Sequence, residues 1–235
     1  MTVIGLTGGI ASGKSTASQQ LQLLGAVIID ADKLGHRVYE PGTPGFQKVV
    51  NAFGHDIVTP DGQIDRRVLG GKVFGAPEEM DRLTDISWPE IRRMAIEEIA
   101  EARERDPEAI VVLEAAVLFE AGWEDLCDEV WAVTTKISTA VERLQERNGM
   151  NEEQAMARID AQMSNRERIE RSDVRIDNSD DLEKFEKGDK TLQEKDATSQ
   201  IFLADLEREN ARLKKLVAEQ ALDKAILEEA LKGKY

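Results

Sequence analysis

This chain of 235 residues has little cysteine and no excess of positive charge. It has a single cysteine, Cys127, so no disulfide can form within the chain, and 46 acidic residues outnumber 31 basic ones, for a formal net charge of -15. A general nucleic-acid surface needs a basic footprint, so we expect no nucleic-acid partner. The lone cysteine is expected to be a small core residue, as suits a reducing cytoplasm.

Long apolar runs are also missing. Residues 1–25 lack the basic and apolar regions of a secretory signal peptide, and no run approaches the roughly 18 residues of a membrane span. Hydrophobic residues still make up 41% of the chain, which is typical of a packed fold. We therefore expect a cytoplasmic protein without a membrane partner.

Short apolar, partly β-branched runs alternate with helical patterns up to about residue 178. The runs are typical of buried parallel strands and read TVIGLT, AVIID, AIVVLEAAVLF, EVWAVTT and DVRID. Amphipathic helical patterns lie between them, for instance over 15–24 and 88–105. The alternation predicts an α/β fold with a doubly wound parallel sheet over about 1–180, which binds ligands at the carboxyl ends of its strands.

Two segments interrupt this alternation. Residues 33–90 combine turn signals with short helical patterns, so we expect a mostly helical region that covers a substrate. Residues 147–172 are polar and helical in propensity, and we expect a mobile lid beside the sheet. Arginines that could reach phosphates occur throughout this lid.

The residues after the first predicted strand fit the phosphate-binding pattern G-x-x-x-x-G-K-[ST], between a strand and a helix as this P-loop motif requires. Glycines in such a loop allow backbone angles that a side chain would forbid, so N–H groups can point at a phosphate. The following helix adds its positive dipole end. We predict a nucleoside triphosphate site made by Gly8, Gly9, Ile10, Ala11, Ser12, Gly13, Lys14, Ser15 and Thr16.

The motif also assigns roles to its polar side chains. Lys14 would bridge the β- and γ-phosphates, and the Ser15 hydroxyl would be a Mg²⁺ ligand. The chain has no N-K-x-D base-reading motif, which disfavours GTPases, and its third predicted strand carries Glu114 without the Asp-Glu ending of large mechanical ATPases. Glu114 is either a Mg²⁺ ligand through water or a structural carboxylate. Small-molecule kinases fit this pattern best.

Such a kinase needs a carboxylate that orients the acceptor hydroxyl and accepts its proton. Asp30 and Asp32 follow the second predicted strand in IIDADKLGH, and alternation along the strand would place both on one side. We predict that Asp32 is the base and that the other aspartate is structural. The alternative is that Asp32 caps a helix that begins at KLGHRVYE.

Segments distributed over residues 1–180 resemble the dephospho-coenzyme A kinase family. They read LTGGIASGKST, VIIDADKLGHRVYEPGTP, DGQIDRRVLGGKVF, VLFEAGW and RIDAQMSNRERIERSDVRIDNS. DADKLGH and the Trp88-Pro89 pair are most similar to the kinase half of animal coenzyme A synthase. The resemblance implies that ATP phosphorylates the ribose 3′-hydroxyl of dephospho-coenzyme A, which gives coenzyme A and ADP in the last step of coenzyme A synthesis.

The resemblance also implies roles for individual residues. Asp32 matches the family's acidic residue at the acceptor hydroxyl, and Arg147 matches a lid arginine that approaches the ATP phosphates. Arg66 and Arg67 match a basic pair in the substrate-facing region, although they could equally be helix-surface charges. Catalysis is thus expected to depend on Asp32, Lys14 and Arg147.

Further candidates come from their places in the sequence. Arg168 is a plausible second lid contact, and His36, shortly after Asp32, is a candidate for the substrate cleft, although a single histidine is more often structural. We expect the remaining large apolar side chains of this region, Leu118, Phe119 and Trp123, in the core.

The sequence changes character after Asn178. Residues 181–199 are charged and predict a linker. Residues 200–235 predict a coiled-coil-like helix that either forms a homodimer or packs on its own domain; the spacing depends on Leu203, Leu206, Asn210, Leu213 and Val217. This helix resembles the zipper of an insertion-sequence transposase subunit, but no helix-turn-helix precedes it, so DNA binding is not expected.

Overall fold

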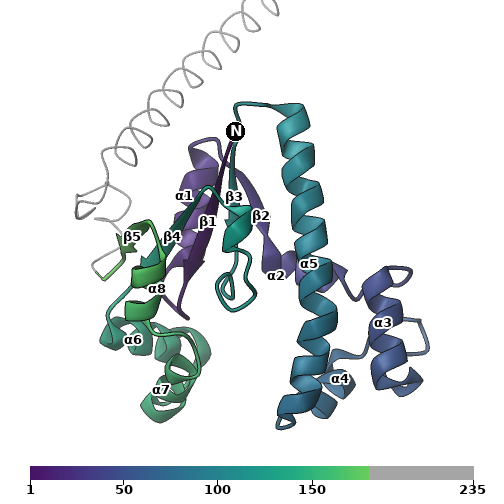
Figure 1. The fold of residues 1–235 in the computed structure, drawn as a ribbon. Helices are drawn as coiled ribbons and strands as arrows, with labels where there is room; N and C mark the ends of the chain where they lie inside the picture. The colour runs from purple at the N-terminus through teal and green to yellow at the C-terminus, as the bar shows by residue number, and fades with distance from the viewer. Residues whose placement is uncertain (180–235) are drawn as a thin grey trace, which may run out of the picture.

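A fully parallel sheet forms the centre of the protein (Figure 1). In the computed structural model, which describes residues 1–179, five strands pair in the order β2-β3-β1-β4-β5. Every neighbouring pair is parallel. The strands are Thr2–Gly8 (β1), Val27–Asp30 (β2), Ile110–Glu114 (β3), Glu129–Thr134 (β4) and Val174–Asp177 (β5). The predicted parallel sheet is confirmed, and each strand lies in or overlaps one of the five apolar runs.

Both faces of the sheet are covered, which explains why the strands are almost continuously apolar. Val3 of β1 packs in a core that includes residues of α2 and α5, whereas Ile4 and Leu6 pack against α1 on the other face. The helices are Lys14–Leu23 (α1), Ala31–Arg37 (α2), Pro44–Phe53 (α3), Arg66–Val73 (α4), Pro77–Arg105 (α5), Ile137–Asn148 (α6), Glu152–Asp160 (α7) and Asn165–Arg171 (α8), with short 3-10 helices at His55–Ile57 and Glu124–Leu126.

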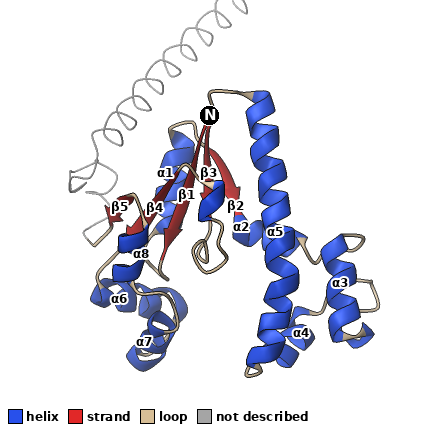
Figure 2. Ribbon diagram, viewed as in Figure 1, coloured by secondary structure: helices blue, strands red, loops and turns tan. Residues whose placement is uncertain are grey.

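The segment 33–90 is mostly helical; α3 lies on the far side of α5 from the sheet, and α4 lies at the lower end of α5 (Figure 2). They form a separate core with the first half of α5. Helix α5 is much longer than the predicted 88–105 and contains Pro89 in its interior. A proline normally breaks a helix. Here the α3–α4 core holds the first half of α5 and the sheet-facing core holds Ile91, Met94 and Ile99 of the second half, so tertiary packing outweighs the lost hydrogen bond.

The predicted linker 181–199 and helix 200–235 lie outside the described residues. Within residues 1–179, no helix is long and apolar enough to cross a bilayer. Leu118, Phe119 and Trp123 are buried, as predicted. Cys127 is half-buried against the same core, and burial raises the pKa of its thiol to about 12, which keeps the sulfur protonated and unreactive.

Candidate functional site

The segment GGIASGKST forms the turn from β1 into α1 at the carboxyl edge of the sheet. Gly13 has a φ of 93°, as the prediction requires. Gly8 does not have a positive φ; instead, a Cβ there would lie 2.6 Å from the Ser12 Oγ and 2.7 Å from the Val133 carbonyl. The prediction that Gly8 supplies unusual backbone angles is therefore wrong, because this glycine is required for space. The left-handed angle falls instead on Ala11, with a φ of 58°.

Several backbone N–H groups of the loop are not hydrogen-bonded to the described part of the protein. Within residues 1–179, the N–H groups of Ala11, Gly13, Lys14 and Ser15 have no protein acceptor. The first turn of a helix always leaves such donors, and its dipole favours an anion beside them. The backbone of this loop therefore suits a phosphate group.

Lys14 is held by Glu114 at the end of β3. Their side chains form an ion pair of 2.6 Å and are only 12% and 9% exposed, respectively. Asp30 is the register partner of Glu114 on the neighbouring strand. Burial opposes ionisation of Asp30, but the hydrogen bonds and charge of Lys33, together with the charge of Lys14, leave its pKa lowered. Of the two alternatives for Glu114, the structure favours a carboxylate that positions the P-loop lysine.

Ser15 is available as a metal ligand. It is exposed in the first turn of α1, and its hydroxyl has no hydrogen-bond partner in the described part of the chain. The same residues contain no group of three or more carboxylate, histidine or cysteine side chains that could hold a metal ion by themselves. The donor set thus fits a Mg²⁺ ion whose other ligands are phosphate oxygens and water.

The two aspartates after β2 have different roles. Asp30 is the N-cap of α2, and its carboxylate accepts hydrogen bonds from the N–H groups of Asp32 at 3.0 Å and Lys33 at 3.1 Å. The expectation that strand alternation governs both residues is wrong, because α2 begins at Ala31. Asp32 lies exposed in the first turn of this helix. Asp30 thus caps α2, whereas the Asp32 side chain is exposed and makes no hydrogen bond within residues 1–179.

A pocket of about 380 Å³ lies between α2 and α4. Arg66 donates to the His36 carbonyl at 3.4 Å, and its guanidinium lies 5.6 Å from the ring centre of Tyr39. The structure thus brings two of the predicted substrate residues, His36 and Arg66, together in one pocket. Arg67 is exposed and does not line this pocket. The lining residues are His36, Tyr39, Glu40, Gln63, Ile64 and Arg66.

The two predicted lid arginines differ in exposure. Arg147 is exposed near the end of α6, and its Nε donates to Asn148. Arg168 is 1% exposed and pairs with Glu120 at 3.5 Å. Burial lowers the pKa of Arg168, against the opposing charges of Glu120 and Glu167. Packing of α8 against β4 buries the Arg168 side chain, so its contact with ATP as a second lid arginine stays a prediction.

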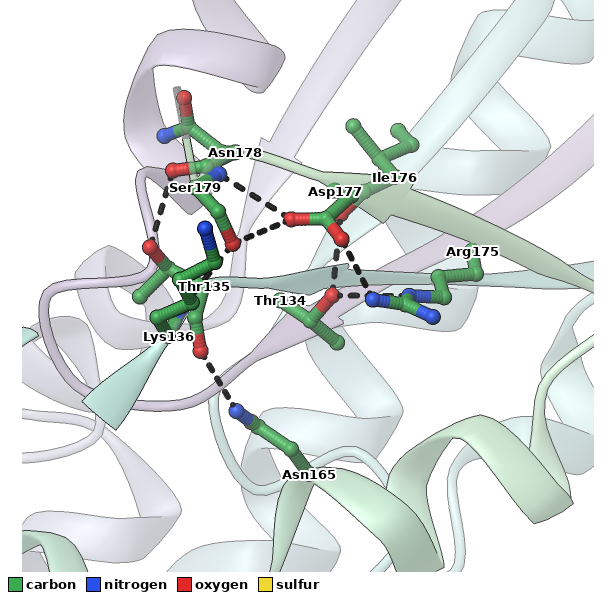
Figure 3. Close-up of polar contacts among 9 residues, drawn as sticks. All are labelled: Thr134, Thr135, Lys136, Asn165, Arg175, Ile176, Asp177, Asn178 and Ser179. Atoms are coloured by element: carbon green, nitrogen blue, oxygen red, sulfur yellow. Dashed lines mark hydrogen bonds and ion pairs between the residues drawn. The ribbon is translucent and has the colours of Figure 1, made fainter. Parts of the chain in front are cut away.

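Two residues that we did not predict donate hydrogen bonds to backbone carbonyls of the P-loop. Arg143 lies one helical turn before Arg147 and donates to the carbonyls of Ala11 at 3.0 Å and Asn178 at 3.1 Å. The side chain of Asn178 donates to the Ser12 carbonyl at 2.9 Å. Its own carbonyl also accepts from the Thr135 hydroxyl (Figure 3). No local pattern marks either residue, because both contacts join distant parts of the chain.

The P-loop follows the central strand of this parallel sheet and contains a lysine, and a helical region follows β2. Together these features define a P-loop kinase. Sequence comparison then identifies the kind of kinase. The model of the dephospho-CoA kinase family matches residues 2–184. The chain belongs to that family, whose kinase chemistry implies the use of ATP.

Individual relatives support this assignment. The chain is 45% identical over 183 residues to a dephospho-CoA kinase of Carboxydothermus hydrogenoformans, a match that covers 78% of this chain and 88% of the relative. The solved structure of TT1252 from Thermus thermophilus is 33% identical, with a TM-score of 0.67 over 80% of this chain and 93% of that one. The dephospho-CoA kinase from Campylobacter jejuni is 28% identical, with a TM-score of 0.60 over 79% and 92%.

Proposed function

We propose that this chain transfers the γ-phosphoryl group of ATP to the ribose 3′-hydroxyl of dephospho-coenzyme A, which gives coenzyme A and ADP. The observation that carries the proposal is the family match over residues 2–184, which spans the P-loop, the two aspartates after β2 and the pocket at Arg66. The open N–H groups of the loop and the exposed Asp32 supply the donor and the acceptor side of such a transfer.

On the donor side, the open amides of the P-loop bind phosphate oxygens of ATP, and Lys14 exchanges Glu114 for the β- and γ-phosphates. Ser15 would hold Mg²⁺, which neutralises charge on the phosphate oxygens when it is bound. Arg147 is exposed on α6 and free to approach the ATP phosphates from the lid. These groups stabilise the charge that develops during transfer.

On the acceptor side, Asp32 orients the ribose hydroxyl and accepts its proton as the oxygen bonds to phosphorus. Arg66 lines the pocket beside α2 together with His36. Its guanidinium pairs with a phosphate of the substrate. A guanidinium suits this role because its N–H groups match phosphate oxygens in a bidentate geometry.

The reaction is tested by ADP release from ATP and Mg²⁺ with dephospho-coenzyme A, measured beside a panel of nucleosides and nucleoside monophosphates. We expect turnover with dephospho-coenzyme A and at most about one hundredth of that kcat/KM with the panel, because polar sites reject substrates that leave their groups unpaired. Turnover with the panel alone would assign another small-molecule kinase. ATP binding without any turnover would leave a nucleotide-binding module.

Replacing Arg66 by alanine is expected to raise the KM for dephospho-coenzyme A about tenfold, because a charge-assisted hydrogen bond to a phosphate is lost. Arg67→Ala is the matched control, since Arg67 is exposed beside Arg66 and lies outside the pocket. Steady-state kinetics with each substrate varied separately checks this. An equal rise in KM for both variants would show that the pocket does not select the substrate.

Three further proposals concern the chain's surroundings. The single cysteine favours a cytoplasmic location, and the net negative charge argues against a nucleic-acid partner. The lack of long apolar runs argues against a membrane partner. The leucine spacing after residue 200 favours a homodimer through that segment.

A further inference from the structure

One peptide unit of the P-loop is hydrogen-bonded at both ends. The carbonyl of Gly9 accepts from the Ser12 N–H at 3.1 Å. The N–H on the other side of the same peptide bond, that of Ile10, donates to the Oε1 of Gln162 at 2.8 Å. The plane of the Gly9–Ile10 peptide is therefore fixed on one side by the loop itself and on the other side by a residue from the predicted lid.

The backbone around Gln162 is anchored by other hydrogen bonds. It lies in the turn between α7 and α8, where its N–H donates to the Ile159 carbonyl at 3.1 Å. At the start of α8, the side chain of Asn165 donates to the Thr135 carbonyl at 2.9 Å, as Figure 3 shows. This turn is thus tied to the end of β4, independently of its contact with the P-loop.

Apolar contacts join the same two elements. Ile10 and Ala11 pack in a small core with residues of α6 and α7, including Met156 and Ile159. Both the side chain and the backbone of Ile10 are therefore held by the region that contains Gln162.

We propose that Gln162 is a positioning residue for ATP, which keeps the P-loop in its phosphate-binding conformation through the Ile10 N–H. The inference rests on the proposed use of ATP and extends it to a residue that touches neither substrate. The hydrogen bond turns the Ile10 N–H toward the lid, so the remaining amides at Ala11, Gly13, Lys14 and Ser15 form the cradle.

The loop needs such support because its conformation is costly. Ala11 adopts a φ of 58°, a left-handed angle that disfavours a residue with a Cβ. Gly9 has no Cβ, and a Cβ there would make ordinary van der Waals contacts with Asn165 at 3.6 Å and Gln162 at 3.8 Å. Because glycine allows many backbone angles, the Gly9–Ile10 peptide could rotate if its N–H lost its acceptor. Rotation would also break the bond from Ser12 to Gly9.

The test is Gln162→Met in the full chain, which keeps the length of the side chain and removes its oxygen. We expect the Kd for Mg·ATP, measured by calorimetry without acceptor, to rise about three- to tenfold, the usual effect of one neutral hydrogen bond. The KM for ATP should rise in parallel, while the KM for dephospho-coenzyme A and kcat change by less than about a factor of two.

Gln154→Met is the matched control. Gln154 lies on α7, and its side chain accepts from the Asn151 N–H in a capping box, away from the P-loop. It therefore reports any general loosening of α7, and we expect its Kd for ATP to stay within about a factor of two of the wild-type value. A rise in Gln162→Met no larger than that in the control, or tighter ATP binding, overturns the proposal.

Amide hydrogen exchange gives a second readout that needs no activity. The Ile10 N–H should be protected in the wild-type chain, exposed in Gln162→Met, and protected again in Gln162→Glu, which restores an acceptor oxygen. Rapid exchange of Ile10 in the wild-type chain overturns the proposal even if the methionine variant does not fold. Normal ATP binding without turnover of dephospho-coenzyme A would count against the proposed function alone.

Discussion

Asp32→Asn is expected to lower kcat by about 10²- to 10⁴-fold, the contribution typical of a positioned general base. The amide keeps the size of the side chain but cannot accept the proton of the acceptor hydroxyl. Because Asp32 is exposed and its carboxylate makes no contact with the P-loop, the Kd for ATP should change by less than about a factor of two. Steady-state ADP release and calorimetry with ATP measure the two quantities.

The control is Asp30→Asn. Asparagine caps helices as well as aspartate does, so the hydrogen bonds from the N–H groups of Asp32 and Lys33 should persist. We expect a much smaller loss of kcat than in Asp32→Asn. If Asp30→Asn abolishes turnover and Asp32→Asn does not, Asp30 is the catalytic base and the assignment to Asp32 is wrong.

Lys14→Ala is expected to weaken ATP binding by about ten- to a hundredfold, because Lys14 supplies charge-assisted hydrogen bonds to the phosphates. A comparable loss in kcat should accompany it, since phosphoryl transfer depends on electrostatic stabilisation. Calorimetry gives the affinity and ADP release gives the rate. ATP affinity within about a factor of three of the wild-type value would exclude the assigned role.

Loss of Lys14 also leaves the Glu114 carboxylate, 9% exposed, without its partner. An unpaired buried charge is destabilising, so the single variant should melt at a lower temperature than the wild-type chain. The double variant Lys14→Ala/Glu114→Gln removes that charge and should recover thermal stability without recovering ATP affinity. Recovery of both would mean that the first variant lost ATP only because it was damaged.

The candidate site was partly predictable from the sequence. The nine residues of the phosphate loop are contiguous, so the motif alone located them. The sequence also predicted Asp32 as the base, but only the structure shows that Asp30 caps α2, through the hydrogen bonds that the Asp30 carboxylate accepts. The spacing could not decide this, because either aspartate is a good N-cap. The lid arginines show the same limit: Arg147 and Arg168 are chemically alike, yet one is exposed and the other is 1% exposed.

The sequence by itself determined the strands, the P-loop and the family, because each depends on neighbours along the chain. An apolar run predicts a buried strand wherever it occurs, and a contiguous motif is visible in the sequence itself. Only the tertiary structure decided which side chains support the loop. Arg143, Gln162 and Asn178 reach it across sequence separations of 132, 152 and 166 residues. The strand order, which places β4 and its following helices beside β1, brings them there, and no local spacing encodes that order.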